Sequence, residues 1–372
     1  PDSRAIVISY GGEIWRVPID GSEPTKIPFE AEVSLELGPE VRFEYPVDDS
    51  PTLIARQIRN AVPSPDGRKL AFTALGRLYV VDLPADAGRS EPVVAAAGEG
   101  ETKASPMVTA PRALVELDVP QHQPAWSPDG SAIAFVTWSD EEGGHIYRVP
   151  ADGRGRHQRL TSVAAYYTQP AWSPDGTRIV AVRSPARARQ EGSGGMGAEF
   201  VWVPARGGDV TVIAPTAGRA SPHFTRDPNR IYVYGGGTGL VSMRWDGTDE
   251  RTHLRVTGAS RAGANNPVPA SQVLISPDGE RAIAQVNADL YVVTVPQVGG
   301  TAPTVSVTNP GNAPVPVRKL TDIGGQFPAW SADGRKVHWS IGNAHVVYDL
   351  ERAQEVEDSL RAERRGAGQG SR

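Results

Sequence analysis

The chain has 372 residues, a net charge of −5 and no cysteine, which excludes disulfides, thiolate catalysis and thiolate metal sites. Its 38 basic residues are dispersed, and neither a basic stripe nor an aromatic RNA-binding signature points to nucleic acid. No apolar run approaches the roughly 18 residues of a membrane-spanning helix, so we expect no membrane insertion. The 40 glycines and 33 prolines favour short strands and turns over long helices.

Three strand-like segments open the chain, at residues 4–10, 13–17 and 24–29. They have the pattern of the second, third and fourth strands of a four-stranded unit whose first strand is missing. We therefore expect residues 1–62 to form a partial N-terminal blade and a connector. The first residue, Pro1, is not Met, which suggests a processed chain.

A turn motif then recurs along the chain, usually behind a tryptophan. Its aspartates are spaced by 63, 46, 52, 51 and 55 residues and stand at Asp66, Asp129, Asp175, Asp227, Asp278 and Asp333. In Ser-Pro-Asp-Gly, the proline presets φ, the Asp side chain caps the turn, and the glycine accepts the positive φ that follows. Each copy therefore predicts a hairpin between two strands.

Short apolar or alternating runs follow each turn, as in residues 132–136 and 145–150. A period of about 40–50 residues with four such strands is typical of propeller blades, whose sheets pack face to face with their neighbours. This packing predicts that Trp126, Trp172 and Trp330 are contacts between blades rather than a ligand cage.

The sequence thus predicts an all-β fold, a β-propeller of four-stranded blades over residues 1–350. Residues 63–350 supply six motif-bearing repeats. The partial N-terminal repeat makes seven blades, the count that we favour, and six remain if those strands lie outside the ring. Residues 351–365 are charged and helix-like, and we expect residues 351–372 to be a disordered tail.

The repeats resemble the Tol-type periplasmic propeller family, with PD40 repeats as in TolB, over residues 63–350. Residues 45–50, 55–59, 70–83 and 138–149 also resemble the propeller that precedes the catalytic barrel of bacterial metal-dependent amidohydrolases. The metal ligands of that family would belong to the barrel, so the resemblance assigns no catalytic residue in this chain.

No catalytic constellation is evident in the sequence. The seven histidines fall in different repeats without the spacing of a metal pair, and a possible hairpin pair, His338 and His345, lacks a carboxylate partner. There is no nucleophile elbow, and the glycine-rich run 192–197 precedes a strand instead of a helix, unlike a phosphate-binding loop. We expect neither a metal site nor a cofactor.

Two polar groups remain as binding candidates. The acidic run Asp140, Glu141 and Glu142 lacks calcium-loop spacing and is interpreted as a solvated hairpin tip. The residues before the first proline of each repeat should ring one mouth of the central channel, which either binds a ligand or holds only water. These candidate ligand-binding residues are His122, Gln123, Thr168, Gln169 and Ser221.

Two functional hypotheses follow. In the first, the chain is a non-catalytic scaffold that binds a protein or peptide partner. In the second, it is the accessory propeller of a metal-dependent amidohydrolase and docks or gates the catalytic domain. The Tol-type resemblance and the lack of cysteine favour a periplasmic or secreted protein.

Overall fold

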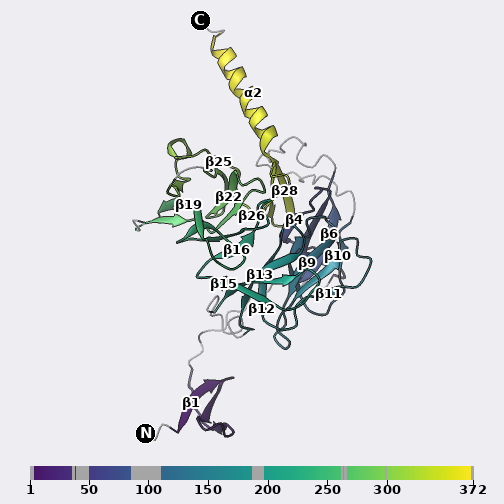
Figure 1. The fold of residues 1–372 in the computed structure, drawn as a ribbon, viewed down its shortest axis with the longest axis vertical. Coiled ribbons are helices and arrows are strands. Elements are labelled where there is room, and N and C mark those ends of the chain that lie inside the picture. Colours follow the sequence, from purple (N-terminus) through teal and green to yellow (C-terminus); the bar gives the residue numbers. More distant parts are fainter. Residues whose placement is uncertain are drawn as a thin grey trace. The chain divides into compact units, whose positions relative to one another are not determined.

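The computed structural model describes residues 4–35, 38, 50–84, 110–186, 197–260, 263, 266–297 and 300–369. The chain separates into two compact units, Pro1–Leu53 and Ile54–Arg372, which we describe one at a time (Figure 1). Residues 45–49 and 192–196, used above, lie outside the described residues.

The N-terminal unit is a three-stranded antiparallel sheet. It contains β1 (Ala5–Tyr10), β2 (Glu13–Pro18) and β3 (Thr25–Ile27), in that order, which confirms the three strands predicted there. Ile6 and Val7 point to opposite faces because successive strand residues alternate, yet both are more than half exposed. The sheet therefore lacks a buried face of its own.

The second unit consists of six sheets that follow one another along the chain, which we call blades 1 to 6. Blade 1 contains β4 (Arg59–Pro63), β5 (Lys69–Ala74), β6 (Arg77–Asp82) and β7 (Arg112–Ala113). Blade 2 contains β8 (Gln121–Trp126), β9 (Ala132–Thr137), β10 (Ile146–Pro150) and β11 (Gln158–Arg159). Blade 3 contains β12 (Tyr166–Trp172), β13 (Arg178–Ser184), β14 (Glu199–Pro204) and β15 (Thr211–Pro215).

Blades 4 to 6 vary this plan. Blade 4 contains β16 (Ala220–His223), β17 (Ile231–Gly235), β18 (Gly239–Met243) and β19 (Arg251–Ser260), extended by β20 (Pro267–Pro269) and the parallel β24 (Thr304–Ser306). Blade 5 contains β21 (Gln272–Ile275), β22 (Arg281–Val286), β23 (Asp289–Thr294) and β25 (Val317–Lys319), and a short 3₁₀ helix, η1 (Pro310–Asn312), precedes β25. Blade 6 contains three strands, β26 (Gln326–Trp330), β27 (Lys336–Ile341) and β28 (Ala344–Asp349).

The recurring turn has the predicted chemistry. In blade 1, the Ser64 hydroxyl donates to Asp66 Oδ1 at 2.6 Å, and the same carboxylate oxygen accepts the N–H of Arg68 at 3.1 Å. Gly67 follows at φ +70°, in the left-handed region that glycine adopts without strain. The same Ser–Asp bond recurs at Asp129, Asp175, Asp278 and Asp333, so these aspartates occupy equivalent turns.

Tryptophans join neighbouring blades, as the repeat predicted. The indole N–H of Trp126 donates to Val62 O of blade 1 at 3.0 Å, that of Trp172 to Ala125 O of blade 2 at 3.0 Å, and that of Trp330 to Leu274 O of blade 5 at 2.9 Å. Their rings are half-buried against the clusters between sheets. Each indole therefore adds a hydrogen bond between blades to the packing that the sequence indicated.

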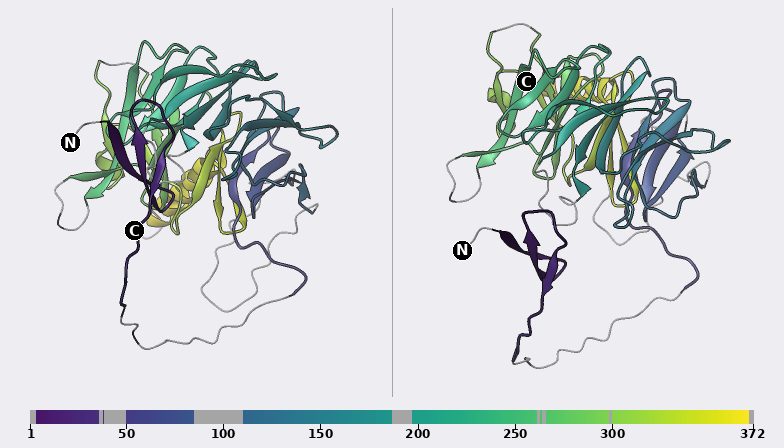
Figure 2. Two further views of the ribbon diagram at one scale, coloured as in Figure 1. Left: turned by 90° about the horizontal axis from the view of Figure 1, so that it is seen from below. Right: turned by 60° about the horizontal axis from the view of Figure 1, so that its bottom comes forward.

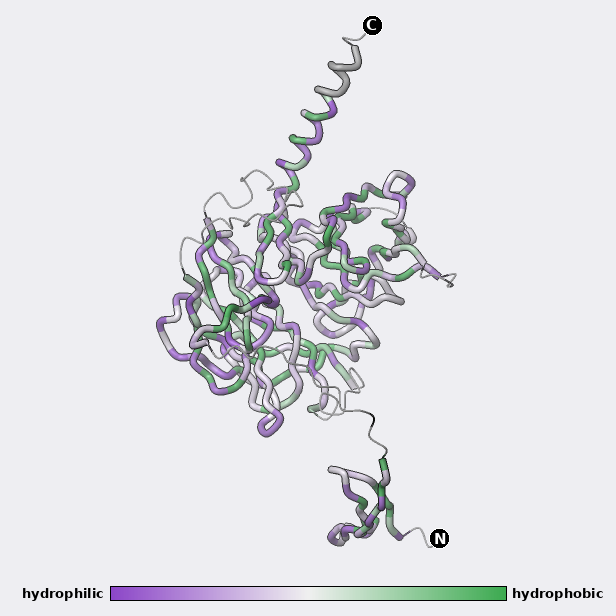
Figure 3. The backbone as a smooth tube through the Cα atoms, turned by 180° about the vertical axis from the view of Figure 1, so that it is seen from behind, coloured by the Kyte–Doolittle hydropathy of each residue, from purple (hydrophilic) through white to green (hydrophobic). Residues whose placement is uncertain are grey.

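The six sheets close on themselves. The first strands β4, β8, β12, β16 and β21 contact one another in succession, and β26 of blade 6 contacts β4 of blade 1. The N–H of Ile58, just before β4, donates to Gly342 O of blade 6 at 2.9 Å. Figure 2 shows these sheets arranged radially, and Figure 3 shows hydrophobic segments along their strands.

The chain is a β-propeller, as predicted. Its described residues form seven sheets, of which six make this closed ring and the seventh is β1–β3.

A helix, α2 (Leu350–Gln369), follows β28 where we expected a disordered tail. Asp349 Oδ1 accepts the N–H groups of Glu351 and Arg352, both at 3.1 Å, which satisfies two donors of the first turn. Glu357 pairs with Arg318 of blade 5. The helix is therefore capped by blade 6 and ion-paired to blade 5. In the described ranges, no helix is long and apolar enough to span a membrane.

Candidate functional site at one mouth of the ring

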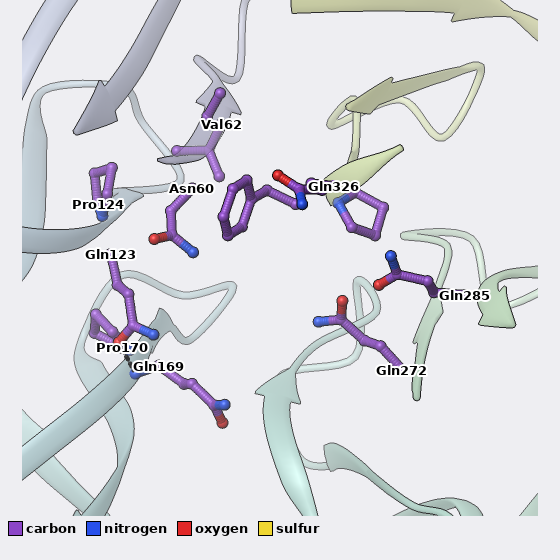
Figure 4. Close-up of a pocket in the computed structure, with 12 residues that line it drawn as sticks. Asn60, Val62, Gln123, Pro124, Gln169, Pro170, Gln272, Gln285 and Gln326 are labelled. Atoms are coloured by element: carbon purple, nitrogen blue, oxygen red, sulfur yellow. Dashed lines mark hydrogen bonds between the residues drawn. The ribbon is translucent and has the colours of Figure 1, made fainter. Parts of the chain in front are cut away.

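A cavity of about 400 Å³ lies where the first strands of blades 1, 2, 3, 5 and 6 converge (Figure 4). Among the described residues, its lining carries no charged side chain. Six carboxamides dominate it, from Asn60, Gln123, Gln169, Gln272, Gln285 and Gln326. Phe327 and three prolines add apolar surface. The cavity is therefore polar but electrically neutral.

Strained backbone places several of these side chains. Asn60, Gln123, Gln169, Ser221 and Phe327 all have φ between 51° and 56°, a region that L-residues seldom adopt. Each stands where the register between the first and second strands of its blade shifts, which marks a β-bulge. The bulge turns the side chain of each residue away from the regular strand alternation. Blade 5 pairs without such a shift.

Glutamine side chains support these bulges across the blade boundaries. Gln123 Oε1 accepts the backbone N–H of Gln169 at 2.7 Å, and Gln169 Oε1 accepts that of Ser221 at 2.7 Å. Each bond binds the backbone of the next blade at its left-handed residue. A lining glutamine is therefore also a structural link, and its removal would disturb the neighbouring blade.

The other half of the mouth uses different bonds. Gln285 Nε2 donates to Gly325 O at 2.9 Å, and Gln272 Nε2 donates to Ser221 Oγ at 3.1 Å. Gln57 Nε2 donates to Gln326 Oε1 at 3.0 Å, across the junction of blades 1 and 6. In the part of the chain that the structure describes, the Asn60 side chain makes no hydrogen bond.

Of the residues that the sequence nominated, Gln123 and Gln169 line the cavity. Phe327, which holds the corresponding position before the first proline of the last repeat, lines it as well. Ser221 holds Gln272 without lining the cavity itself. His122 and Thr168 are also outside its lining, and each pairs with the second strand of its blade, with Val136 and Val182 respectively. Ligand binding by these residues stays a prediction.

The sequence reasoning missed Asn60, Gln272, Gln285 and Gln326. Gln326 had a detectable signal, since it precedes Phe327 as His122 precedes Gln123. Asn60 lacks the proline at the next position, but it stands four residues before Ser64, the same spacing as Gln123 has to Ser127. Gln285 lies on a second strand and is placed opposite Gln272 by the regular pairing of blade 5.

The other polar candidates are structural. His338 Nδ1 lies 3.1 Å from His345 Nε2, and burial lowers the pKa of the two imidazoles to about 3 and about 4. Asp140, Glu141 and Glu142 are exposed at a hairpin tip, and Asp140 accepts the indole N–H of Trp138. Within the described ranges, no three His, Asp or Glu side chains lie close enough together to hold a metal ion.

Comparison with known proteins yields similarity of structure alone. The chain matches no protein-family model and no curated protein. Among solved structures, it is similar to a chain assigned as TolB from Agrobacterium tumefaciens, with 19% identity, a TM-score of 0.49, and coverage of 79% of this chain and 89% of that one.

TolB from Acinetobacter baumannii is 16% identical, with a TM-score of 0.46, and the match covers 78% of this chain and 59% of that one. An oligogalacturonate lyase in complex with manganese is 13% identical, with a TM-score of 0.47, and the match covers 78% of this chain and 88% of that one. The activities in these names belong to those proteins.

Proposed function

We propose that this chain is a non-catalytic interaction module that binds a peptide segment of a protein partner at the carboxamide-lined mouth. The observation that carries the proposal is the neutral cavity, in which six carboxamides from five blades converge. Its volume of about 400 Å³ lies within the range of about 300–1,000 Å³ typical of ligand sites.

The backbone at the mouth supports the same proposal. Left-handed non-glycine residues cost on the order of 1–3 kcal/mol each and cluster at functional sites. Four lining residues, Asn60, Gln123, Gln169 and Phe327, have this conformation. Repetition of the strain in several blades is consistent with selection for the mouth that it creates.

Exposed apolar side chains near the cavity fit a protein partner. Leu75, Val163 and Ile323 are 70%, 60% and 82% exposed, respectively. Leu75 adjoins Gly76, whose carbonyl accepts the N–H of Gln121 at the start of β8, and Val163 and Ile323 precede β12 and β26. All three thus lie near the beginnings of first strands, the region from which Gln123, Gln169 and Gln326 project.

Selection from a random linear peptide library on the purified chain tests the proposal. We expect selected peptides to bind the native chain and to lose about tenfold in affinity with Asn60→Ala combined with Gln326→Ala. Glu141→Ala, at the exposed hairpin tip, is the matched control and should leave affinity unchanged. Peptides that bind both variants equally well would place the interaction elsewhere.

A separate assay tests the non-catalytic part. The chain, stripped of metal and reloaded with Zn²⁺, Mn²⁺ or Ca²⁺, should not hydrolyse amide or ester substrates. Metal-dependent turnover that disappears with His338→Ala and His345→Ala would contradict this part of the proposal.

The accessory-propeller hypothesis is a special case of the same activity, with a hydrolase domain as the partner. It predicts that a separately purified amidohydrolase barrel binds the chain and that the exposed aliphatic residues above contribute to this binding. The periplasmic or secreted location is proposed with it, and fractionation of expressing cells checks that location.

A further inference from the structure

The hydrogen bonds at the mouth determine which atom of a carboxamide, Oε1 or Nε2, remains available to a ligand. A backbone N–H can only donate, so Gln123 and Gln169 must turn Oε1 toward the next blade to accept it. The Nε2 groups of Gln123 and Gln169 take no part in these two interblade bonds. This side of the cavity therefore presents N–H donors to a ligand.

The facing side has the opposite polarity. Gln285 donates through Nε2 to a carbonyl, Gly325 O, so its Oε1 is the end that remains. Gln272 is oriented in the same sense, with Nε2 toward Ser221 Oγ, although a hydroxyl can pair with either end of a carboxamide. Figure 4 shows Gln123 and Gln169 on one side of the cavity and Gln272 and Gln285 on the other. This second side therefore presents Gln285 Oε1 as an acceptor.

We propose that the mouth binds a main-chain peptide unit of an internal, uncharged segment, with its carbonyl toward Gln123 and Gln169 and its N–H toward Gln285. A trans peptide unit carries its C=O and N–H on opposite edges, which matches a cavity with the Nε2 donors of Gln123 and Gln169 on one side and the Oε1 acceptor of Gln285 on the other. This inference rests on the proposed function and specifies the ligand chemistry of the same site.

Other ligand chemistries match less well. A terminal carboxylate only accepts and a terminal ammonium only donates, so each leaves one side unpaired, and the lining residues that the structure describes offer no charge to compensate either. A sugar hydroxyl both donates and accepts at one point and gains nothing from the separation of the two sides. The observations therefore favour an amide over a chain terminus or a carbohydrate.

Titration of the purified full chain with small probes tests the inference. The probes are N-acetyl-alanyl-alanine N-methylamide, acetate, methylammonium and a methyl glucoside, followed through the side-chain NH₂ resonances of Gln123 and Gln169. We expect the capped peptide to bind about tenfold more tightly than each of the others, because an unpaired polar group costs about 1–3 kcal/mol. An ester in place of the central amide should lose a similar factor.

Polarity reversal provides the sharper test. Gln123→Glu with Gln169→Glu keeps an oxygen for each interblade N–H but replaces the donors that face the cavity with acceptors. We expect the capped peptide, now followed through the side-chain NH₂ resonances of Gln272 and Gln285, to lose about tenfold in affinity and methylammonium to gain affinity. Asn312→Asp, outside the cavity lining, adds a negative charge as a control and should change neither. Unchanged thermal unfolding of the double variant establishes that the fold is retained.

These measurements can refute the peptide-unit assignment. Stronger binding of acetate or methyl glucoside than of the capped peptide, or no response to any probe, would overturn the peptide-unit assignment. The library selection remains an independent test. If selected peptides require Asn60 and Gln326 and still bind the Gln123→Glu, Gln169→Glu variant with native affinity, the result would support the proposed interaction module. It would refute only the assignment of donors and acceptors in the cavity.

Discussion

Trp172 shows how one residue of the repeat serves two purposes. Its ring packs against the cluster between blades 2 and 3, and its N–H satisfies Ala125 O. Trp172→Ala should therefore destabilise the chain by about 3 kcal/mol through lost packing. Trp172→Phe, which keeps a ring but leaves the carbonyl unpaired, should cost about 1–3 kcal/mol. Urea unfolding measures both, with Glu141→Ala as the control. Equal urea midpoints for all three variants would show that Trp172 does not contribute to the core.

The buried histidines predict a loss of stability in mild acid. Burial lowers the pKa of His253, His338 and His345 to about 4, about 3 and about 4, against 6.5 for an ordinary imidazole. The unfolded chain therefore binds more protons than the folded chain below pH 6.5, and the free energy of unfolding falls as pH drops toward 4. The lowered carboxylate pKa values, such as that of Asp66, act only at still lower pH.

Denaturant unfolding across this pH range measures the effect. His338→Gln should flatten the pH dependence relative to the native chain, whatever its effect at pH 7. An equally steep dependence in the variant would show that the proton uptake occurs elsewhere.

At the scale of elements, α2 depends on its first turn. Asp349→Ala removes the acceptor for two N–H groups and should cost about 1 kcal/mol of helix stability, in the range for a lost N-cap. Asp349→Asn, which retains a capping oxygen, is the matched control. Far-ultraviolet circular dichroism and hydrogen exchange of residues 351–358 report the loss, and protection that does not differ between the variants would contradict the capping role.

Elements dictated by local chemistry could be predicted from the sequence. The turn at Asp129 needs only Ser127, its own carboxylate and Gly130, all adjacent in the chain, and the strands on either side follow from alternation. Gln123 and Gln169 were found because a proline marks their position in the repeat.

The rest of the mouth depends on relations between elements. Asn60 reaches the cavity through a register shift in a repeat without that proline, and Gln285 through cross-strand pairing with Gln272. The helix α2 depends partly on Arg318, which lies in a strand of another blade. No local pattern in the sequence encodes these distant partners.

At the scale of the whole molecule, the ring should be independent of the N-terminal unit. Blade 6 contacts blade 1 through β26 and β4, so the six sheets form a closed set of contacts without β1–β3. Removal of residues 1–53 should leave the thermal midpoint of the ring within a few degrees of the native value. A large drop would mean that the N-terminal sheet completes the propeller. Residues 1–53 alone should not unfold cooperatively, because a small sheet with two exposed faces is marginal in water.

The glutamine links between blades also constrain how such a ring can be rebuilt. Gln123 of blade 2 holds blade 3, and Gln169 of blade 3 holds blade 4, so these two links pass in one sense around the axis, whereas Gln272 of blade 5 reaches back to Ser221 of blade 4. A blade inserted between blades 2 and 3 would need a left-handed residue whose backbone N–H donates to Gln123. It would also need a glutamine of its own to accept the N–H of Gln169 in the blade that follows. Blade 5, which has no bulge, could not take that place. The repeats are therefore not interchangeable modules, and engineers who duplicate or shuffle them must transplant donor and recipient positions together.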